Sequence, residues 1–137
     1  MTPKQKQLVR QSFKQVAPIA DRAATLFYAR LFELDPALRS LFKGDMAEQG
    51  RKLMKTIAVA VDSLDRLDDL VPLVQDLGRR HVEYGVQPAH YDSVGSALLW
   101  TLEQGLGKDF TPETREAWTV VYGLLAGAMK DAAYKLY

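Results

Sequence analysis

The stretch GRRHVEYGV, Gly78–Val86, contains His81, one of only two histidines in this 137-residue chain. The residues before it are apolar at three- and four-residue spacing, the pattern of an amphipathic helix. Leu77 and Leu73 precede His81 by four and eight residues, so we expect the imidazole to face inward with them. The sequence therefore predicts a titratable group on the buried face of a helix. It is either a hydrogen-bonded core histidine or a ligand.

The same apolar spacing extends over almost the whole chain and predicts an all-α fold without a credible strand. In the first helix the expected inner stripe is Leu8, Phe13 and Val16. Capping residues and prolines mark the other boundaries. Helix starts are expected at Thr2-Pro3, Asp35-Pro36, Asp45, about Asp69, Pro88 and Thr111-Pro112, and interruptions at Pro18 and Gly85.

The composition excludes several classes of protein. Lys and Arg total 18 and Asp and Glu 17, so no charge excess favours nucleic acid or a membrane surface. The absence of cysteine excludes disulfides and thiolate chemistry. No apolar run suits a signal peptide or a membrane span. We expect a single domain over residues 1–137, in a soluble cytoplasmic protein that is a monomer or weak homodimer.

Four polar residues interrupt the apolar stripes: Tyr28, Gln49, His81 and Tyr91. A buried amide such as that of Gln49 costs about 1–3 kcal/mol without partners, although Gln49 can also lie near solvent at its helix start. Tyr28 follows Phe27 in a nearly all-apolar helix, so its hydroxyl group points either into a polar pocket or into water. His90, the second histidine, is in the first turn of a helix, where we expect a surface position.

The metal chemistry open to His81 is narrow. A zinc site needs several His, Cys or carboxylate ligands, and the sequence offers no such set. A single axial histidine suffices for haem iron, because the porphyrin supplies the other four equatorial ligands.

Four segments, taken together, resemble the globin family, and most closely bacterial single-domain haemoglobins and the globin domain of flavohaemoglobins. The likeness covers essentially the whole chain. The segments are LFYARLFELDPALRSLF at 26–42, EQGRKLM at 48–54, RRHVEYGVQPAHYDSVG at 79–95 and AWTVVYG at 117–123. The resemblance implies a globin fold, a helical sandwich around a pocket for haem b (iron protoporphyrin IX).

The resemblance also implies a role for each residue that matches the family pattern. His81 matches the proximal iron ligand, with the carbonyl group near Leu77 available to its second nitrogen. Tyr28 and Gln49 match the distal tyrosine and glutamine, which contact the gas ligand. Five further positions match residues that surround the haem or its ligand: Phe42 on the porphyrin face, Leu53 on the ligand side, Tyr91 beside the proximal histidine, and Val94 and Leu98 in the pocket wall. Phe27, Leu77 and Tyr122 complete the expected cofactor-binding set.

This likeness implies reversible binding of dioxygen and of other diatomic ligands such as CO and NO, as in oxygen transport. The alternatives are a nitric oxide dioxygenase, which converts dioxygen and NO to nitrate and needs a separate reductase, or a haem-based gas sensor with a partner chain. A haem-free globin-like module is disfavoured by the inward histidine and the polar distal pair. One position departs from the flavohaemoglobin pattern, because Ala133 stands where a glutamate is expected to support the proximal histidine. Asp131, two residues earlier, is turned roughly 200° away on a helix.

Overall fold

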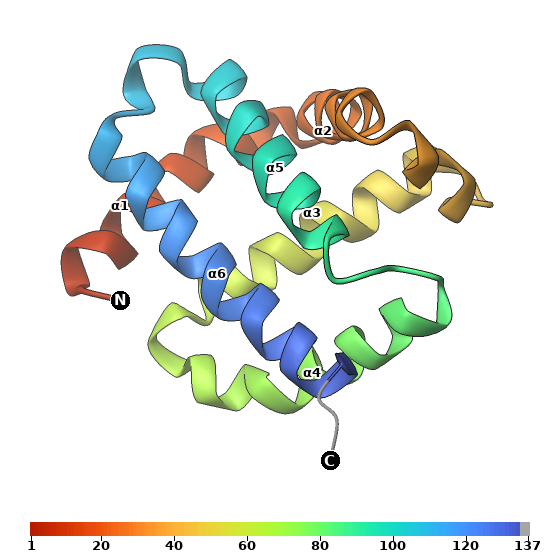
Figure 1. Cartoon of the computed structure of the whole chain (residues 1–137). Coiled ribbons are helices and arrows are strands. Elements are labelled where there is room, and N and C mark those ends of the chain that lie inside the picture. Colours follow the sequence, from red (N-terminus) through yellow and green to blue (C-terminus); the bar gives the residue numbers. More distant parts are fainter. Residues whose placement is uncertain (135–137) are drawn as a thin grey trace.

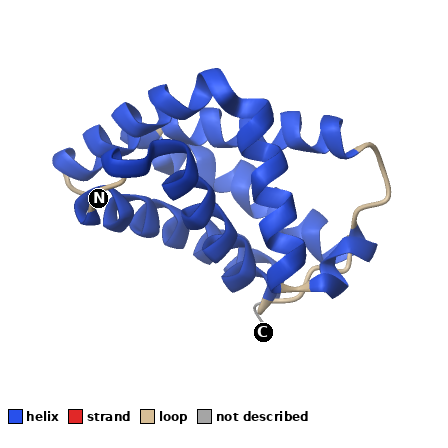
Figure 2. Ribbon diagram, turned by 90° about the horizontal axis from the view of Figure 1, so that it is seen from above, coloured by secondary structure: helices blue, strands red, loops and turns tan. Residues whose placement is uncertain are grey.

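A computed structural model describes residues 1–134 of the chain. These residues form six α-helices and four short 3-10 segments and contain no strand, so the all-α prediction is confirmed for the described part (Figure 2). The conformation of residues 135–137 is outside the description. Within residues 1–134, no helix is both long and apolar enough to cross a lipid bilayer.

The N-terminal half begins with α1, Pro3–Val16. The Thr2 hydroxyl group accepts from the Gln5 N–H, and the Gln5 side chain accepts from the Thr2 N–H, which is the predicted capping box. A 3-10 turn at Ala17–Ile19 contains Pro18 and separates α1 from α2, Ala20–Leu34. A second 3-10 segment, Pro36–Leu41, follows.

The central part comprises α3, Met46–Asp62, a 3-10 turn at Leu64–Arg66, and α4, Leu67–Glu83. Asp45 caps α3 by accepting from the Ala47 N–H at 2.9 Å. Gly85 has a φ of 93°, a left-handed conformation that favours glycine and ends α4 where the sequence predicts.

The C-terminal part consists of α5, His90–Leu106, a 3-10 turn at Gly107–Asp109, and α6, Pro112–Tyr134. The Thr111 hydroxyl group accepts from the Thr114 N–H at 3.2 Å and thereby caps α6. Two predicted helix starts are displaced by two residues, since α4 begins at Leu67 and α5 at His90.

The helices pack in two groups that share one interior. α6 contacts α4 and α1, whereas α2 contacts α5 and α3 (Figure 1). The larger buried cluster lies around Val9, Val16, Leu64 and Trp118, and a second cluster is centred on Phe27, Tyr28 and Leu31. The smaller cluster is the one that contains residues expected at a ligand site.

The inner face of α1 differs from the predicted stripe. Val9, Ser12 and Val16 are buried, whereas Leu8 and Phe13 are only partly buried against the core. Ser12 is tolerated inside because its hydroxyl group accepts from the Trp118 indole N–H at 2.8 Å and bonds the Leu8 carbonyl oxygen at 2.7 Å. This pair joins α1 to α6 within the larger core.

Candidate functional site

His81 lies near the C-terminal end of α4 and is partly buried. Its Nδ1 is 2.7 Å from the Leu77 carbonyl oxygen, one turn back in the same helix. A carbonyl oxygen can only accept, so Nδ1 donates, and the neutral ring keeps an unprotonated Nε2. Burial lowers the pKa of His81, against the opposing effect of the Leu77 hydrogen bond, and the nearby Arg80 charge lowers it further. The ring is therefore held neutral with one nitrogen free to act as a ligand.

Leu73 corrects the prediction for the first half of this helix. We expected Leu73 to face inward with Leu77 and His81, but its side chain is 65% exposed. Eight residues on an α-helix turn through about 800°, which leaves Leu73 roughly 80° away from the direction of His81. The inward stripe of α4 instead begins at the buried Leu70.

On α2, Tyr28 is buried with only 7% of its surface exposed. Burial raises the pKa of Tyr28, and a hydrogen-bonding interaction with the Gln49 side chain opposes that rise. Gln49 is partly buried in the first turn of α3. The two polar residues predicted to form the distal pair thus lie together, although they come from different helices.

A close crossing of α2 and α3 brings Tyr28 and Gln49 near each other. A Cβ atom added to Gly50 would lie 2.8 Å from the Cβ atom of Ala24, so glycine allows the two helices to approach. Gly50 directly follows Gln49, and Ala24 lies one turn before Tyr28. The contact between the two small residues therefore fixes the distance between the helices at the position of the pair.

Apolar and aromatic side chains surround Tyr28. The Phe27 ring meets the Tyr28 ring edge-on at 5.0 Å, and the Phe42 ring does so at 5.3 Å. Such edge contacts suit the aromatic quadrupole. The structure gathers six of the predicted site residues in this single cluster: Phe27, Tyr28, Phe42, Leu53, Val94 and Leu98.

Two other predicted residues, Tyr91 and Tyr122, form a separate pair. The Tyr122 hydroxyl group donates to the Tyr91 carbonyl oxygen at 2.6 Å. Tyr91 is 5% exposed, and its own hydroxyl group is buried without a hydrogen-bond partner among the described residues. Burial raises the pKa of Tyr91 to about 12 and also raises that of Tyr122. The Tyr91 hydroxyl group is thus an unused donor inside the protein.

The packing of α4 is one-sided. It lies closely against α6, where a Cβ atom on Gly78 would come within 2.8 Å of the Met129 Cα atom. The Tyr134 hydroxyl group on α6 donates to the Val86 carbonyl oxygen just beyond α4. Contacts of α4 with α2, α3 and α5 are sparse. Direct protein packing therefore does not join His81 to the cluster around Tyr28.

His90 also departs from its predicted surface position. Its side chain is only 19% exposed, and its Nδ1 accepts from the Gln87 N–H at 2.9 Å. Its Nε2 lies 3.9 Å from an Asp35 carboxylate oxygen. The residue closes the turn before α5, which explains its partial burial.

Two residues that sequence reasoning missed lie beside the predicted ones. The Tyr84 ring is 5.7 Å from the His81 ring, and its spacing of three residues on a helix could have indicated this contact. The Lys130 ammonium group lies 5.8 Å from the centre of the Tyr91 ring. No local pattern could have indicated the second contact, because it joins α6 to α5.

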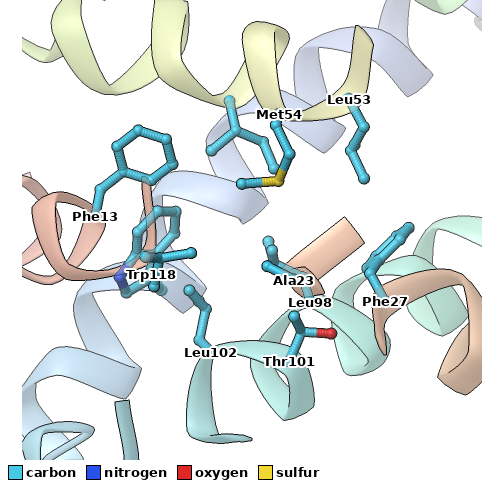
Figure 3. A pocket seen from close by; sticks show the side chains of 11 residues that line it. Phe13, Ala23, Phe27, Leu53, Met54, Leu98, Thr101, Leu102 and Trp118 are labelled. Atoms are coloured by element: carbon cyan, nitrogen blue, oxygen red, sulfur yellow. The ribbon is translucent and has the colours of Figure 1, made fainter. Parts of the chain in front are cut away.

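An apolar cavity of about 20 Å³ extends from the Tyr28 cluster into the larger core. Figure 3 shows Phe27 and Leu53 at one end and Phe13 and Trp118 at the other. Thr101 is the one lining residue with a hydroxyl group, and this group bonds the Ala97 carbonyl oxygen at 2.8 Å. The cavity has room for about one very small molecule and no unsatisfied group to hold water.

The donor set suits an axial-ligand site and not a bare metal ion. Within residues 1–134, no group of three or more His, Asp or Glu side chains is placed to hold an ion. A haem needs from the protein one neutral imidazole and an apolar, aromatic lining. His81, the Tyr28 cluster and the buried Tyr91 hydroxyl group, which has no hydrogen-bond partner within residues 1–134, fit that group.

Comparisons with known proteins agree with this geometry. A family model described as "Globin" matches residues 25–129. The neuroglobin of Danio rerio is 34% identical, covering 94% of this chain and 90% of that protein, and the neuroglobin of Tetraodon nigroviridis is 32% identical with the same coverage. A solved structure of a hexacoordinated haem protein from an anhydrobiotic tardigrade matches with a TM-score of 0.87 at 17% identity. This match covers 96% of this chain and 94% of the tardigrade chain.

Proposed function

The chain belongs to the globin family, and on that premise we propose that it is a haem b protein that reversibly binds dioxygen and other diatomic gases. The observation that carries the proposal is His81, a neutral imidazole whose Nδ1 is engaged by the Leu77 carbonyl oxygen while its Nε2 stays free. When bound, the haem iron supplies the coordination position at which a diatomic gas is held.

On the proximal side, His81 would bind the iron through its free Nε2. The Leu77 hydrogen bond fixes the tautomer and the ring orientation and makes the imidazole a better donor to the metal. Tyr91 and Tyr122, which are hydrogen-bonded to each other, would line this side. Arg80 is paired with Asp76 at 3.2 Å, so its charge is partly neutralised.

On the distal side, Tyr28 and Gln49 offer the hydrogen-bond donors. Dioxygen held on the haem would take on negative charge and CO much less, so the two donors would discriminate between the gases. A hydrogen bond to a charged group contributes about 1.5–3 kcal/mol, or roughly ten- to a hundredfold in affinity. We therefore expect slow oxygen release. The apolar cavity beside Leu53 suits a small uncharged gas molecule.

Coordination distinguishes this chain from a hexacoordinated protein such as the tardigrade neighbour. The sequence has only two histidines, and both nitrogens of His90 face other groups, Gln87 and Asp35. We propose that no second histidine reaches the iron and that the ferrous form without gas is five-coordinate. The expected likeness to bacterial single-domain haemoglobins is not supported by the relatives named above, which at 32–34% identity are neuroglobins.

Nitric oxide dioxygenation remains the alternative function. The Tyr28–Gln49 pair would also hold dioxygen for reaction with NO, but an outside electron donor must restore the ferrous state. Consumption of one equivalent of NO by the oxygenated protein, followed by sustained turnover with a reductase, would favour the enzyme. Failure of turnover with every reductase tested would leave the oxygen-binding protein. A gas-sensing role needs a partner chain with an output.

The first test is an absorption spectrum of the purified protein, ferric, then reduced, then with oxygen and with CO. We expect a Soret band, a five-coordinate ferrous spectrum, and stable oxygenated and carbonyl forms. His81→Ala should abolish haem retention. The matched control, His90→Ala, should retain it. No Soret band after addition of hemin would overturn the proposal, and equal loss in both variants would show that His81 is not the ligand.

A further inference from the structure

We propose that Lys130 acts as a fixed positive charge on the proximal side and favours the ferrous state of the iron. The inference rests on the haem function proposed above. It deepens that function by naming a residue that controls the redox balance without touching the cofactor. Its ammonium group lies 5.8 Å from the centre of the Tyr91 ring, a cation–π distance.

The position of Lys130 is set by two anchors between α6 and α4. Met129 abuts Gly78, three residues before His81, and the Tyr134 hydroxyl group bonds the Val86 carbonyl oxygen, five residues after His81. Lys130 therefore lies on the part of α6 that runs beside the His81 segment. Its contact with Tyr91 places the charge where α4, α5 and α6 meet.

Within the described residues 1–134, no carboxylate forms an ion pair with Lys130. Arg80, the cation whose charge lowers the pKa of His81, is by contrast paired with Asp76. Asp131 and Asp92 are exposed. Lys130 itself is partly buried, so solvent screens its charge less than it would that of an exposed lysine.

A positive charge beside Tyr91, on the side of the haem that His81 would hold, has a defined electrostatic effect. Ferric iron carries one more positive charge than ferrous iron, so a nearby cation destabilises the ferric form relative to the ferrous form. The reduction potential rises as a result. The oxygenated protein then converts more slowly to the ferric state, a step in which one electron passes from the iron to dioxygen, which leaves as superoxide. A carboxylate at this place would lower the reduction potential instead. Positions 130 and 133 carry a lysine and an alanine, so neither side chain is a carboxylate.

The test is the reduction potential of the haem-loaded full-length protein and of four variants. Lys130→Gln removes the charge and Lys130→Glu inverts it. Lys130→Arg keeps the charge. Lys108→Gln is the matched control, because it removes one lysine charge beyond the far end of α5, roughly 22 Å along the helix from Tyr91. Thermal unfolding of each apoprotein establishes that the variants fold.

We expect the potential to fall from wild type to Lys130→Gln and further to Lys130→Glu. Each step should lower the ferrous-to-ferric ratio at a fixed potential by roughly three- to tenfold, the scale of one charge in a partly buried site. Conversion of the oxygenated protein to the ferric form should speed up in the same order. Lys130→Arg and Lys108→Gln should match wild type.

Other outcomes separate the two proposals. Haem binding with unchanged potentials in Lys130→Gln and Lys130→Glu would overturn the role of Lys130 and leave the haem function intact. An equal fall of the reduction potential in Lys108→Gln would mean that the effect depends only on net charge. That result would also overturn the role of Lys130. Failure of the wild-type protein to bind haem would overturn the proposed function and this inference with it.

Discussion

Tyr28 and Gln49 differ in burial, and this difference ranks them as donors to a gas ligand. Tyr28 is buried among aromatic rings and rigidly placed, whereas Gln49 is partly buried in the first turn of α3. We expect Tyr28→Phe to speed oxygen release about tenfold or more, because a hydrogen bond to a charged ligand is lost without a change in shape. Stopped-flow displacement of oxygen by CO measures the rate.

Gln49→Leu serves as the comparison for Tyr28→Phe. It should change the oxygen off-rate less, since Gln49 is nearer to solvent than the buried Tyr28. A larger effect in Gln49→Leu would reverse the ranking, and an unchanged rate in Tyr28→Phe would mean that the phenol group does not reach the ligand.

The ionisation of the buried tyrosines gives a second prediction for single side chains. Burial raises the pKa of Tyr91 to about 12 from 10.0. The folded state then holds a proton that the unfolded chain releases, so stability is complete below about pH 10 and is lost as the pH rises toward 12. We expect the urea midpoint of wild type to fall over this range and that of Tyr91→Phe to fall less. Tyr84→Phe is the control, because Tyr84 is 55% exposed, and an equal gain there would contradict the assignment.

Single residues also show where the sequence is informative. The hydrogen bond between His81 Nδ1 and the Leu77 carbonyl group, which the globin resemblance implied, is present, and it is local because both partners belong to one helix turn. Leu73 and His90 were misplaced. The helical rotation over eight residues places Leu73 on the outer face of α4. The hydrogen bond from the Gln87 N–H to His90 Nδ1, in the turn before α5, holds His90 partly buried. Such effects depend on local geometry that the apolar pattern does not contain.

Among the helices, the starts were predictable and the crossings were not. Thr2, Asp45 and Thr111 cap helices as expected, because capping is a contact within three residues. The crossing of α4 and α6 depends on Gly78, whose small size matters only because Met129 lies opposite. The sequence offers no sign of that pairing across fifty residues.

The close crossing of α4 and α6 predicts that adding one methyl group at Gly78 strongly destabilises the fold. In Gly78→Ala the new Cβ atom would lie 2.8 Å from the Met129 Cα atom and closer still to its carbonyl oxygen. Backbone atoms cannot rotate away, so we expect a loss of about 1–3 kcal/mol in the free energy of unfolding. The displaced α4 should also release hemin faster. Urea unfolding of the apoprotein and transfer of hemin to an acceptor protein measure the two effects.

Gly127→Ala is the matched control within α6. No atom lies within 4 Å of the position that its Cβ atom would take, and its φ is not positive. Because alanine favours the helix over glycine, this change should stabilise the protein by roughly 0.5–1 kcal/mol. Equal destabilisation of both variants would mean that the α4–α6 contact is not tight.

Across the whole chain, the unequal packing of the helices predicts how stability is distributed. α2 contacts both α3 and α5, whereas α4 is held mainly by α6, and the exposed Leu73 and Tyr84 lie on its outer positions. A helix with few buried contacts opens at a lower free energy than the rest of the fold. In the apoprotein, amides of Leu67–Glu83 should therefore exchange with solvent at least about tenfold faster than those of Ala20–Leu34.

Binding of haem should remove this difference in amide exchange between α4 and α2. The cofactor would fill the side of α4 that the protein leaves uncovered, and His81 would bind the iron. Hydrogen exchange followed by mass spectrometry, with and without hemin, gives the comparison helix by helix. Slower exchange should concentrate in α4. In His81→Ala, added hemin should leave α4 as fast as in the apoprotein. Protection of α4 equal to that of α2 before hemin is added would contradict the one-sided packing, and with it the argument that the space beside His81 belongs to a cofactor.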